Sequence, residues 1–160
     1  MSIKVGDKVP SATLKVMTAD GPASVSTDEL FGKGKAVMFS VPGAFTPTCS
    51  ARHLPGFVDH LDEIRAKGVD RVVCIAVNDV FVMNAWGKSA NVGDKIVMAA
   101  DGNGEFTRAL GLELDARGFG MGQRGQRFAM ITEDGIVKAL DVEAPGEFKV
   151  SSAEHVLGQL

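Results

Sequence analysis

Short apolar runs with strand character alternate along this chain with segments of helical periodicity, and this alternation constrains the fold more than any other feature. The runs are rich in β-branched and aromatic residues, which is typical of buried strands. Helical segments between successive strands are typical of an α/β domain with a sheet flanked by helices. The sequence therefore predicts an α/β fold with strands over residues 12–17, 35–41, 69–77, 96–100, 128–132 and 136–142.

Capping residues indicate where several helices begin. Ser26 with Glu29, and Ser151 with Glu154, have the spacing of a capping box, in which the two side chains satisfy each other's backbone N–H groups. Asn78 is placed to cap a third helix. These signals predict helices after residues 26, 78 and 151.

A further helix is predicted after Cys49, ending near Gly68, with an early kink because Pro55 removes one backbone hydrogen bond. Between the last two strands, Glu133-Asp134-Gly135 predicts a hairpin turn. The helix after Cys49 has an apolar stripe at Leu54, Phe57, Val58, Leu61 and Ile64.

Length and charge restrict the class of protein. With 160 residues, 45% of them hydrophobic and 23% charged, residues 1–160 are expected to form a single domain with a substantial core. A net charge of −3 gives no electrostatic footprint for nucleic acid or an anionic membrane. The N-terminus has no apolar signal core, and two cysteines are too few for a disulfide scaffold. We therefore expect a cytoplasmic protein without nucleic-acid or membrane partners.

Cys49 stands at a predicted junction between a strand and a helix. Pro42-Gly43 ends the preceding strand run, Thr46 is a suitable N-cap, and Pro47 suits the first helical position. Cys49 then falls at the third position of the helix, where unpaired N–H groups and the helix dipole favour a thiolate. This placement predicts a reactive cysteine.

Ionisation alone limits how fast such a cysteine can react. A free thiol is roughly 3% ionised at pH 7, so complete ionisation raises its rate at most about 30-fold, or about 2 kcal/mol. A fast catalyst needs further groups that stabilise charge in the transition state. Arg127 is a candidate, because an arginine entering the apolar strand 128–132 needs an anionic partner; Arg124 is less favoured.

Two other residues could take part in the chemistry. Cys74 lies within an apolar run and is interpreted as structural, although a disulfide with Cys49 stays open. His53, four residues after Cys49, could pair with the thiol, ligate a metal, or pack beside the site with a structural hydrogen bond; the last is favoured and no metal is expected. The glycines at 120, 122 and 125 precede a strand rather than a helix, so they predict a tight or flexible loop and no nucleotide.

Taken together, these segments resemble the type-II or five-like branch of the peroxiredoxins from residue 3 to residue 160. The sequence around Cys49 (PGAFTPTCS, residues 42–50) is similar to that branch's signature for the peroxidatic cysteine, and HLPGF (53–57) continues it. The segments around Asn78, Arg127 and Asp134 follow in family order. The resemblance implies a thioredoxin-like fold with a central mixed β-sheet and an antioxidant thiol peroxidase.

The resemblance also implies residue roles. Cys49 resembles the thiolate that attacks a hydroperoxide and becomes a sulfenic acid, and Thr46 the hydroxyl that orients the peroxide. Arg127 resembles the guanidinium that stabilises the thiolate and the developing charge, and Pro42 the ring that shields the pocket. A substrate pocket that favours alkyl hydroperoxides over hydrogen peroxide could be lined by Phe45, Phe119, Met121 and His53.

One departure affects the reductant. Some members of the branch carry a resolving cysteine near the C-terminus, whereas residues 148–152 contain none. The chain thus resembles a one-cysteine version, or one that uses Cys74 as the resolving thiol. It is expected to need no cofactor and to be recycled by glutathione with glutaredoxin rather than by thioredoxin. The resemblance also suggests a homodimer.

Other functions remain open from the sequence. A thiol-disulfide reductase or a glutathione transferase could share the fold, although the absence of Cys-x-x-Cys argues against the reductase. A peroxide-sensing relay protein, or a chaperone-like dimer, would need no rapid turnover. Turnover with an abundant reductant distinguishes a peroxidase from a sensor.

Overall fold

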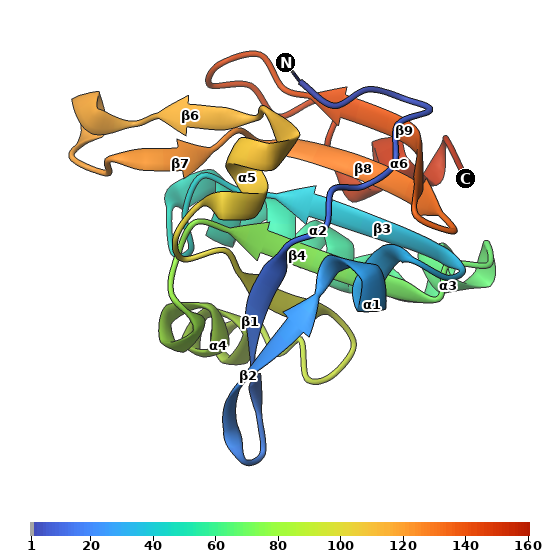
Figure 1. Cartoon of the computed structure of the whole chain (residues 1–160), viewed down its shortest axis with the longest axis horizontal. Helices are drawn as coiled ribbons and strands as arrows, with labels where there is room; N and C mark the ends of the chain where they lie inside the picture. Colours follow the sequence, from blue (N-terminus) through green and yellow to red (C-terminus); the bar gives the residue numbers. More distant parts are fainter. Residues whose placement is uncertain (1) are drawn as a thin grey trace.

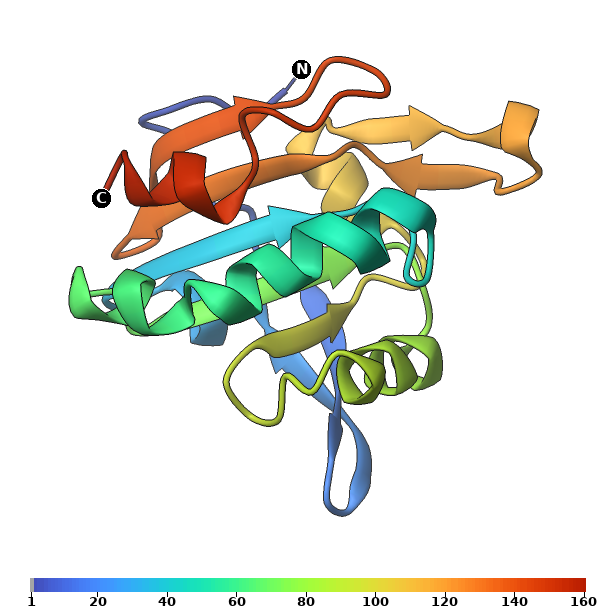
Figure 2. The same cartoon turned by 180° about the vertical axis from the view of Figure 1, so that it is seen from behind.

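A computed structural model describes residues 2–160 as a mixed seven-stranded sheet covered by helices on both faces (Figures 1 and 2). The strand order is β2-β1-β5-β4-β3-β8-β9, and a separate hairpin pairs β6 with β7. This arrangement confirms the predicted α/β class and the central mixed sheet. The strands are β1 (Thr13–Thr18), β2 (Gly21–Ser26), β3 (Lys35–Ser40), β4 (Arg71–Ala76), β5 (Val97–Ala100), β6 (Glu113–Asp115), β7 (Gln123–Gly125), β8 (Phe128–Glu133) and β9 (Ile136–Val142).

The helices divide between the two faces of the sheet. Helices α1 and α5 lie in front of it in Figure 1, whereas α2, α3 and α6 cover the other face and come forward in Figure 2. No helix in the described part of the chain combines the length and apolar character needed to cross a bilayer. The bounds are α1 (Thr27–Phe31), a π-helical turn η1 (Cys49–His53), α2 (Leu54–Asp59), α3 (Leu61–Ala66), α4 (Val80–Ser89), α5 (Glu105–Leu110), a 3₁₀ turn η2 (Arg117–Phe119) and α6 (Ala153–Leu157).

Strand β3 shows why the central strands read as unbroken apolar runs. Val37 and Phe39 pack into the core beneath α2, α3, α4 and α6, and Met38 packs into the core beneath α1 and α5. Because a strand turns alternate side chains to opposite faces, a strand covered on both faces must be apolar throughout. This burial explains why the predicted runs match β3, β4 and β8. The runs predicted at β1, β5 and β9, which are less buried, also agree with the structure, so all six lie within two residues of the predicted bounds at either end.

The sequence analysis did not predict three of the strands and one of the helices. Strand β2 is a polar edge strand that contains Pro22, and β6 and β7 are three residues long and pair only with each other. Around η2 the chain turns tightly, with Gly120 and Gly122 at positive φ, as predicted for the glycine-rich stretch. The missed helix, α5, begins where Asp101 accepts hydrogen bonds from the backbone N–H groups of its first turn.

Two predicted caps are wrong by one residue. Asp79 rather than Asn78 caps α4, because the Asn78 side chain accepts from the N–H of Ala44 instead. Ser152 rather than Ser151 caps α6, because Ser151 bonds to Glu143. The capping box at the start of α1 and the hairpin turn between β8 and β9 are confirmed.

The helix after Cys49 is divided into three pieces. In η1 the N–H of Leu54 donates to the carbonyl of Cys49, five residues earlier, directly before the predicted disruption at Pro55. The chain breaks again at His60, which was not predicted, and it ends at Lys67 before Gly68. Widening the turn before Pro55 lets the helix continue past a residue that has no N–H to donate.

Candidate active site

Cys49 lies in the first turn of the helix that follows β3. The chain is helical from Pro47, and the N–H of Ser50 donates to the carbonyl of Thr46, so Cys49 is the third helical residue as predicted. The predicted side-chain cap is wrong, however: the Thr46 hydroxyl donates to the carbonyl of Gly43 at 2.7 Å. The Cys49 side chain is fully buried.

Arg127 reaches Cys49 because of the register between two strands. Phe128, the first residue of β8, pairs with Ser40, the last residue of β3, so Arg127 lies at the end of the sheet where the Cys49 helix begins. The Arg127 Nη2–H donates to the Cys49 sulfur at 3.0 Å. A cation in contact with sulfur stabilises a thiolate more than a thiol.

Arg124 has a different role. It donates from Nε to the carbonyl of Met121 and from Nη1 to the carbonyl of Val77. It thereby links the β6–β7 hairpin to the loop after β4. The prediction that Arg127 points inward, in preference to Arg124, therefore agrees with the contacts of the two side chains.

His53 lies behind Arg127. It does not line the cavity described below, so the prediction that it lines a substrate pocket is wrong. Its ring accepts from Arg127 Nη1–H at Nδ1 (2.8 Å), and its Nε2 lies 2.9 Å from the carbonyl of Ser151. Burial, reinforced by the charge of Arg127, lowers the pKa of His53 to about 3. Both ring nitrogens are engaged away from the sulfur, so His53 and Cys49 form no nucleophile–base pair, and no three potential metal-ligating side chains converge within residues 2–160.

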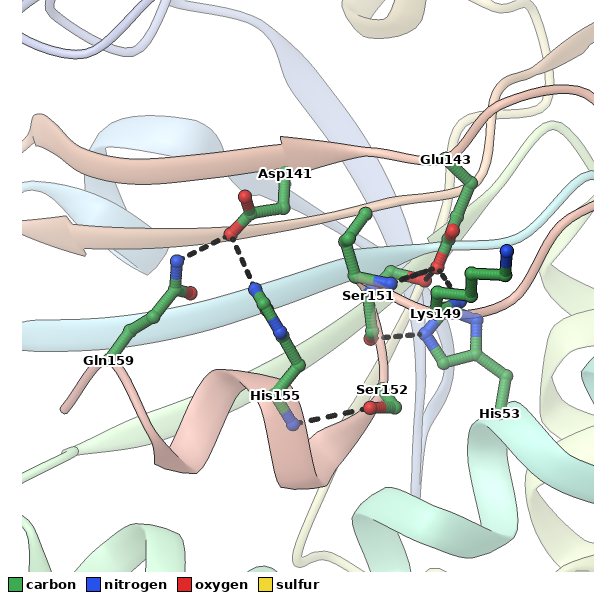
Figure 3. A network of polar contacts seen from close by, with 9 residues as sticks. His53, Asp141, Glu143, Lys149, Ser151, Ser152, His155 and Gln159 are labelled. Atoms are coloured by element: carbon green, nitrogen blue, oxygen red, sulfur yellow. Dashed lines mark hydrogen bonds and ion pairs between the residues drawn. The ribbon is translucent and has the colours of Figure 1, made fainter.

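Sequence reasoning missed the carboxylate that supports this arrangement. Glu143, just after β9, accepts hydrogen bonds from Ser151 and from backbone N–H groups in the segment before α6 (Figure 3). An acidic residue at the end of a strand, followed by Ala-Pro-Gly, is the only local signal that could have drawn attention to it.

A cavity of about 310 Å³ opens beside Arg127, and neither the buried Cys49 nor Thr46 contributes to its wall. Pro42 and Arg127 line it, as do the predicted pocket residues Phe119 and Met121. Phe45 does not line the cavity, because its side chain is directed to the surface and is 54% exposed. The remaining wall is mostly apolar and consists of Thr48, Leu114, Ala116, Gln126, Glu143, Ala144, Pro145, Gly146 and Glu147.

Cys74 is buried in β4, paired with Phe39 of the neighbouring strand β3. Burial raises the pKa of this thiol well above its usual value, and the proximity of Cys49 adds to the effect. Both cysteines are unpaired in the structure. The environment of Cys74 thus favours a neutral, unreactive thiol.

Comparison with known proteins is consistent with this geometry. The chain matches the Redoxin family model over residues 4–157. It is 50% identical to the chloroplastic peroxiredoxin-2E-2 of Oryza sativa, across 99% of this chain and 73% of the relative, and 46% identical to peroxiredoxin-2B of Arabidopsis thaliana, across 99% and 98%. The crystal structure of reduced Prx3 from Vibrio vulnificus in complex with hydrogen peroxide superposes with a TM-score of 0.94 at 50% identity, covering 98% of each chain. The chain therefore belongs to the peroxiredoxins of the redoxin family, in their type-II or five-like branch.

Proposed function

We propose that this chain is a thiol peroxidase in which Cys49 reduces hydrogen peroxide and alkyl hydroperoxides. The observation that carries the proposal is the contact between Arg127 Nη2–H and the Cys49 sulfur at 3.0 Å. The thiolate attacks the terminal peroxide oxygen and the O–O bond breaks. Cys49 becomes a sulfenic acid, and the departing oxygen takes up a proton and leaves as water or an alcohol.

The neighbours of Cys49 have distinct roles in this reaction. The Arg127 guanidinium stabilises the thiolate and the negative charge that develops on the leaving oxygen. The Thr46 hydroxyl orients the peroxide, and Pro42 shields the reacting atoms from water as part of the cavity wall. Since ionisation alone gives at most about a 30-fold gain, Arg127 and Thr46 must supply the rest.

The cavity supports substrates with an apolar group. Phe119 and Met121 contribute to its wall, and about 310 Å³ is room for a short alkyl chain beyond the peroxide group. An apolar wall attracts such a chain through the hydrophobic effect. We therefore include alkyl hydroperoxides together with hydrogen peroxide among the substrates.

Glutathione with glutaredoxin is the proposed reductant. One glutathione thiolate attacks the Cys49 sulfenic acid and releases water, and a second thiol reduces the mixed disulfide. The cycle then needs neither a cofactor nor Cys74, whose burial supports a structural role. Two unpaired thiols also support a reducing compartment such as the cytoplasm.

A homodimer is the proposed assembly. Phe45 and Phe81 are 54% and 63% exposed, and the hydrogen bond from Ala44 N–H to Asn78 joins the loop that carries Phe45 to the start of α4, which carries Phe81. Large exposed aromatic side chains near an active site are typical of an interface. Analytical ultracentrifugation of wild type and Phe81→Glu tests this, with a weakened dimer expected for the variant.

Stopped-flow kinetics test the peroxidase. Reduced wild type should consume hydrogen peroxide far faster than free cysteine, Cys49→Ser should be inactive, and Thr46→Val or Arg127→Ala should slow oxidation by well over 30-fold. Turnover is then compared with glutathione alone, with glutathione plus glutaredoxin, and with thioredoxin and its reductase. Wild-type oxidation no faster than that of free cysteine would rule out the peroxidase, and fast oxidation with slow recycling by every reductant would favour a sensor.

A further inference from the structure

A chain of hydrogen bonds runs from the buried carboxylate of Glu143 through Ser151, His53 and Arg127 to the Cys49 sulfur. Figure 3 shows its first part, from Glu143 to His53. Glu143 Oε2 accepts from the N–H groups of Lys149, Val150 and Ser151 at 2.8, 2.9 and 2.8 Å, and from the Ser151 hydroxyl at 2.7 Å. Burial disfavours its ionisation, but the four donors outweigh burial and lower the pKa of Glu143. One carboxylate thus fixes the backbone of residues 149–151.

The fixed segment determines the tautomer of His53. A carbonyl oxygen only accepts, so the Ser151 carbonyl requires a hydrogen on the His53 Nε2 that lies 2.9 Å away. In a neutral ring the other nitrogen, Nδ1, then carries a lone pair and accepts from Arg127. The lowered pKa of His53 keeps the ring neutral at physiological pH.

The orientation of the ring is also restricted by packing. Phe39 and Phe148 lie on the ring at centroid distances of 4.9 Å each. A ring held by two aromatic neighbours and by a carbonyl presents its Nδ1 in a single direction. His53 therefore offers Arg127 an acceptor at a fixed position.

The planar guanidinium transmits this position to the sulfur. Its two Nη atoms have a fixed relative geometry, so an acceptor at Nη1 determines where Nη2 points. We infer that His53 is a positioning residue for the peroxidase reaction, which orients Arg127 toward Cys49, and that Glu143 acts through Ser151 to hold His53 in place. The inference rests on the proposed function, because it specifies how the guanidinium of that site is aimed.

Two substitutions separate the two hydrogen bonds of His53. In His53→Asn the side-chain oxygen can occupy the position of Nδ1 and still accept from Arg127, but the donor to Ser151 is lost. In His53→Gln the side-chain nitrogen can occupy the position of Nε2 and still donate to Ser151, but the acceptor for Arg127 is lost. Both variants remove the aromatic ring, so they are matched controls for packing.

The readout is the ratio of two reactions of the same thiol at one pH. Alkylation by iodoacetamide requires a thiolate but no positioned cation, whereas reduction of hydrogen peroxide requires both. For His53→Gln we expect the peroxide rate to fall at least about tenfold, the loss of one charge-assisted hydrogen bond, while alkylation falls less than about threefold. For His53→Asn we expect the ratio of the two rates to stay within about threefold of wild type, and a purely structural role would lower both reactions together.

Two further variants complete the design. His155→Asn alters the histidine of α6 that contacts Asp141 and should change neither rate. Glu143→Gln replaces one acceptor oxygen by an amide and should lower the ratio as His53→Gln does; if the His53 variants do not fold, it decides the test alone. An unchanged ratio in His53→Gln, or in Glu143→Gln where that variant decides alone, overturns the inference, as does an equal loss in the Asn and Gln variants. Slow peroxide reduction by wild type itself overturns the proposed function instead.

Discussion

Mild acid should selectively destabilise the native protein through His53. In the folded state the pKa of His53 is about 3, against 6.5 for a solvated histidine. Between these values the unfolded chain binds a proton that the folded chain cannot bind, so the stability that neutral His53 contributes is complete above pH 6.5 and is lost as the pH falls toward 3. At 1.36 kcal/mol per pH unit, the 1.5 units from pH 6.5 to pH 5 cost about 2 kcal/mol.

Urea unfolding at pH 7, 6 and 5, at a fixed protein concentration, measures the free energy of unfolding of wild type and of His53→Asn. The variant has no titrating group at position 53, so it serves as the reference. His60 titrates with the opposite sign, because its hydrogen bond to Glu63 raises its pKa and adds stability at low pH that is lost as the pH rises. His60 is present in both proteins, so its contribution cancels in the comparison. The loss of unfolding free energy from pH 7 to pH 5 should be about 2 kcal/mol larger in wild type than in His53→Asn. An excess loss below about 0.5 kcal/mol would refute the reasoning, because it would mean that folded His53 accepts a proton almost as readily as in water.

Three further perturbations test other parts of the structure. Arg127→Lys keeps the charge but cannot contact both His53 and Cys49, so stopped-flow oxidation should slow by at least about 100-fold; a loss under about 30-fold would mean that charge alone suffices. Cys74→Ser should retain turnover in a glutathione-coupled assay, and inactivity there would identify Cys74 as a resolving thiol. Gly135→Ala should lower the free energy of unfolding by about 1–2 kcal/mol, because Gly135 has φ of 82°; an Asn at this position, which tolerates positive φ, should cost less.

The central strands were predictable because burial on both faces requires a continuous run of apolar residues. β3 and β4 are apolar at nearly every position, so their runs could be recognised without knowledge of their partners. β2 and the β6–β7 hairpin carry polar residues, glycine or proline and pair with a neighbour in sequence, and their strand conformation depends on that pairing rather than on composition.

The two displaced caps have a common cause. At the start of both α4 and α6, two adjacent residues are able to cap the helix, and the first of the two makes a tertiary contact instead. Asn78 accepts from Ala44 N–H, and Ser151 donates to Glu143. A local rule cannot choose between neighbours when the choice depends on residues far away. The same limit hid the role of His53, whose partner Ser151 is 98 positions away.

The contact between Arg127 and Cys49 spans 78 residues, which has a consequence for the biosynthesis of the protein. A chain growing from its N-terminus emerges with Cys49 long before β8, and the segment that holds His53 emerges later still. Until that segment docks, Cys49 has neither its cation nor the support behind it and reacts like any cysteine in a peptide. The proposed fast oxidation of this thiol is therefore a property that the chain acquires only after Arg127 and residues 149–151 have been synthesised and have folded onto it.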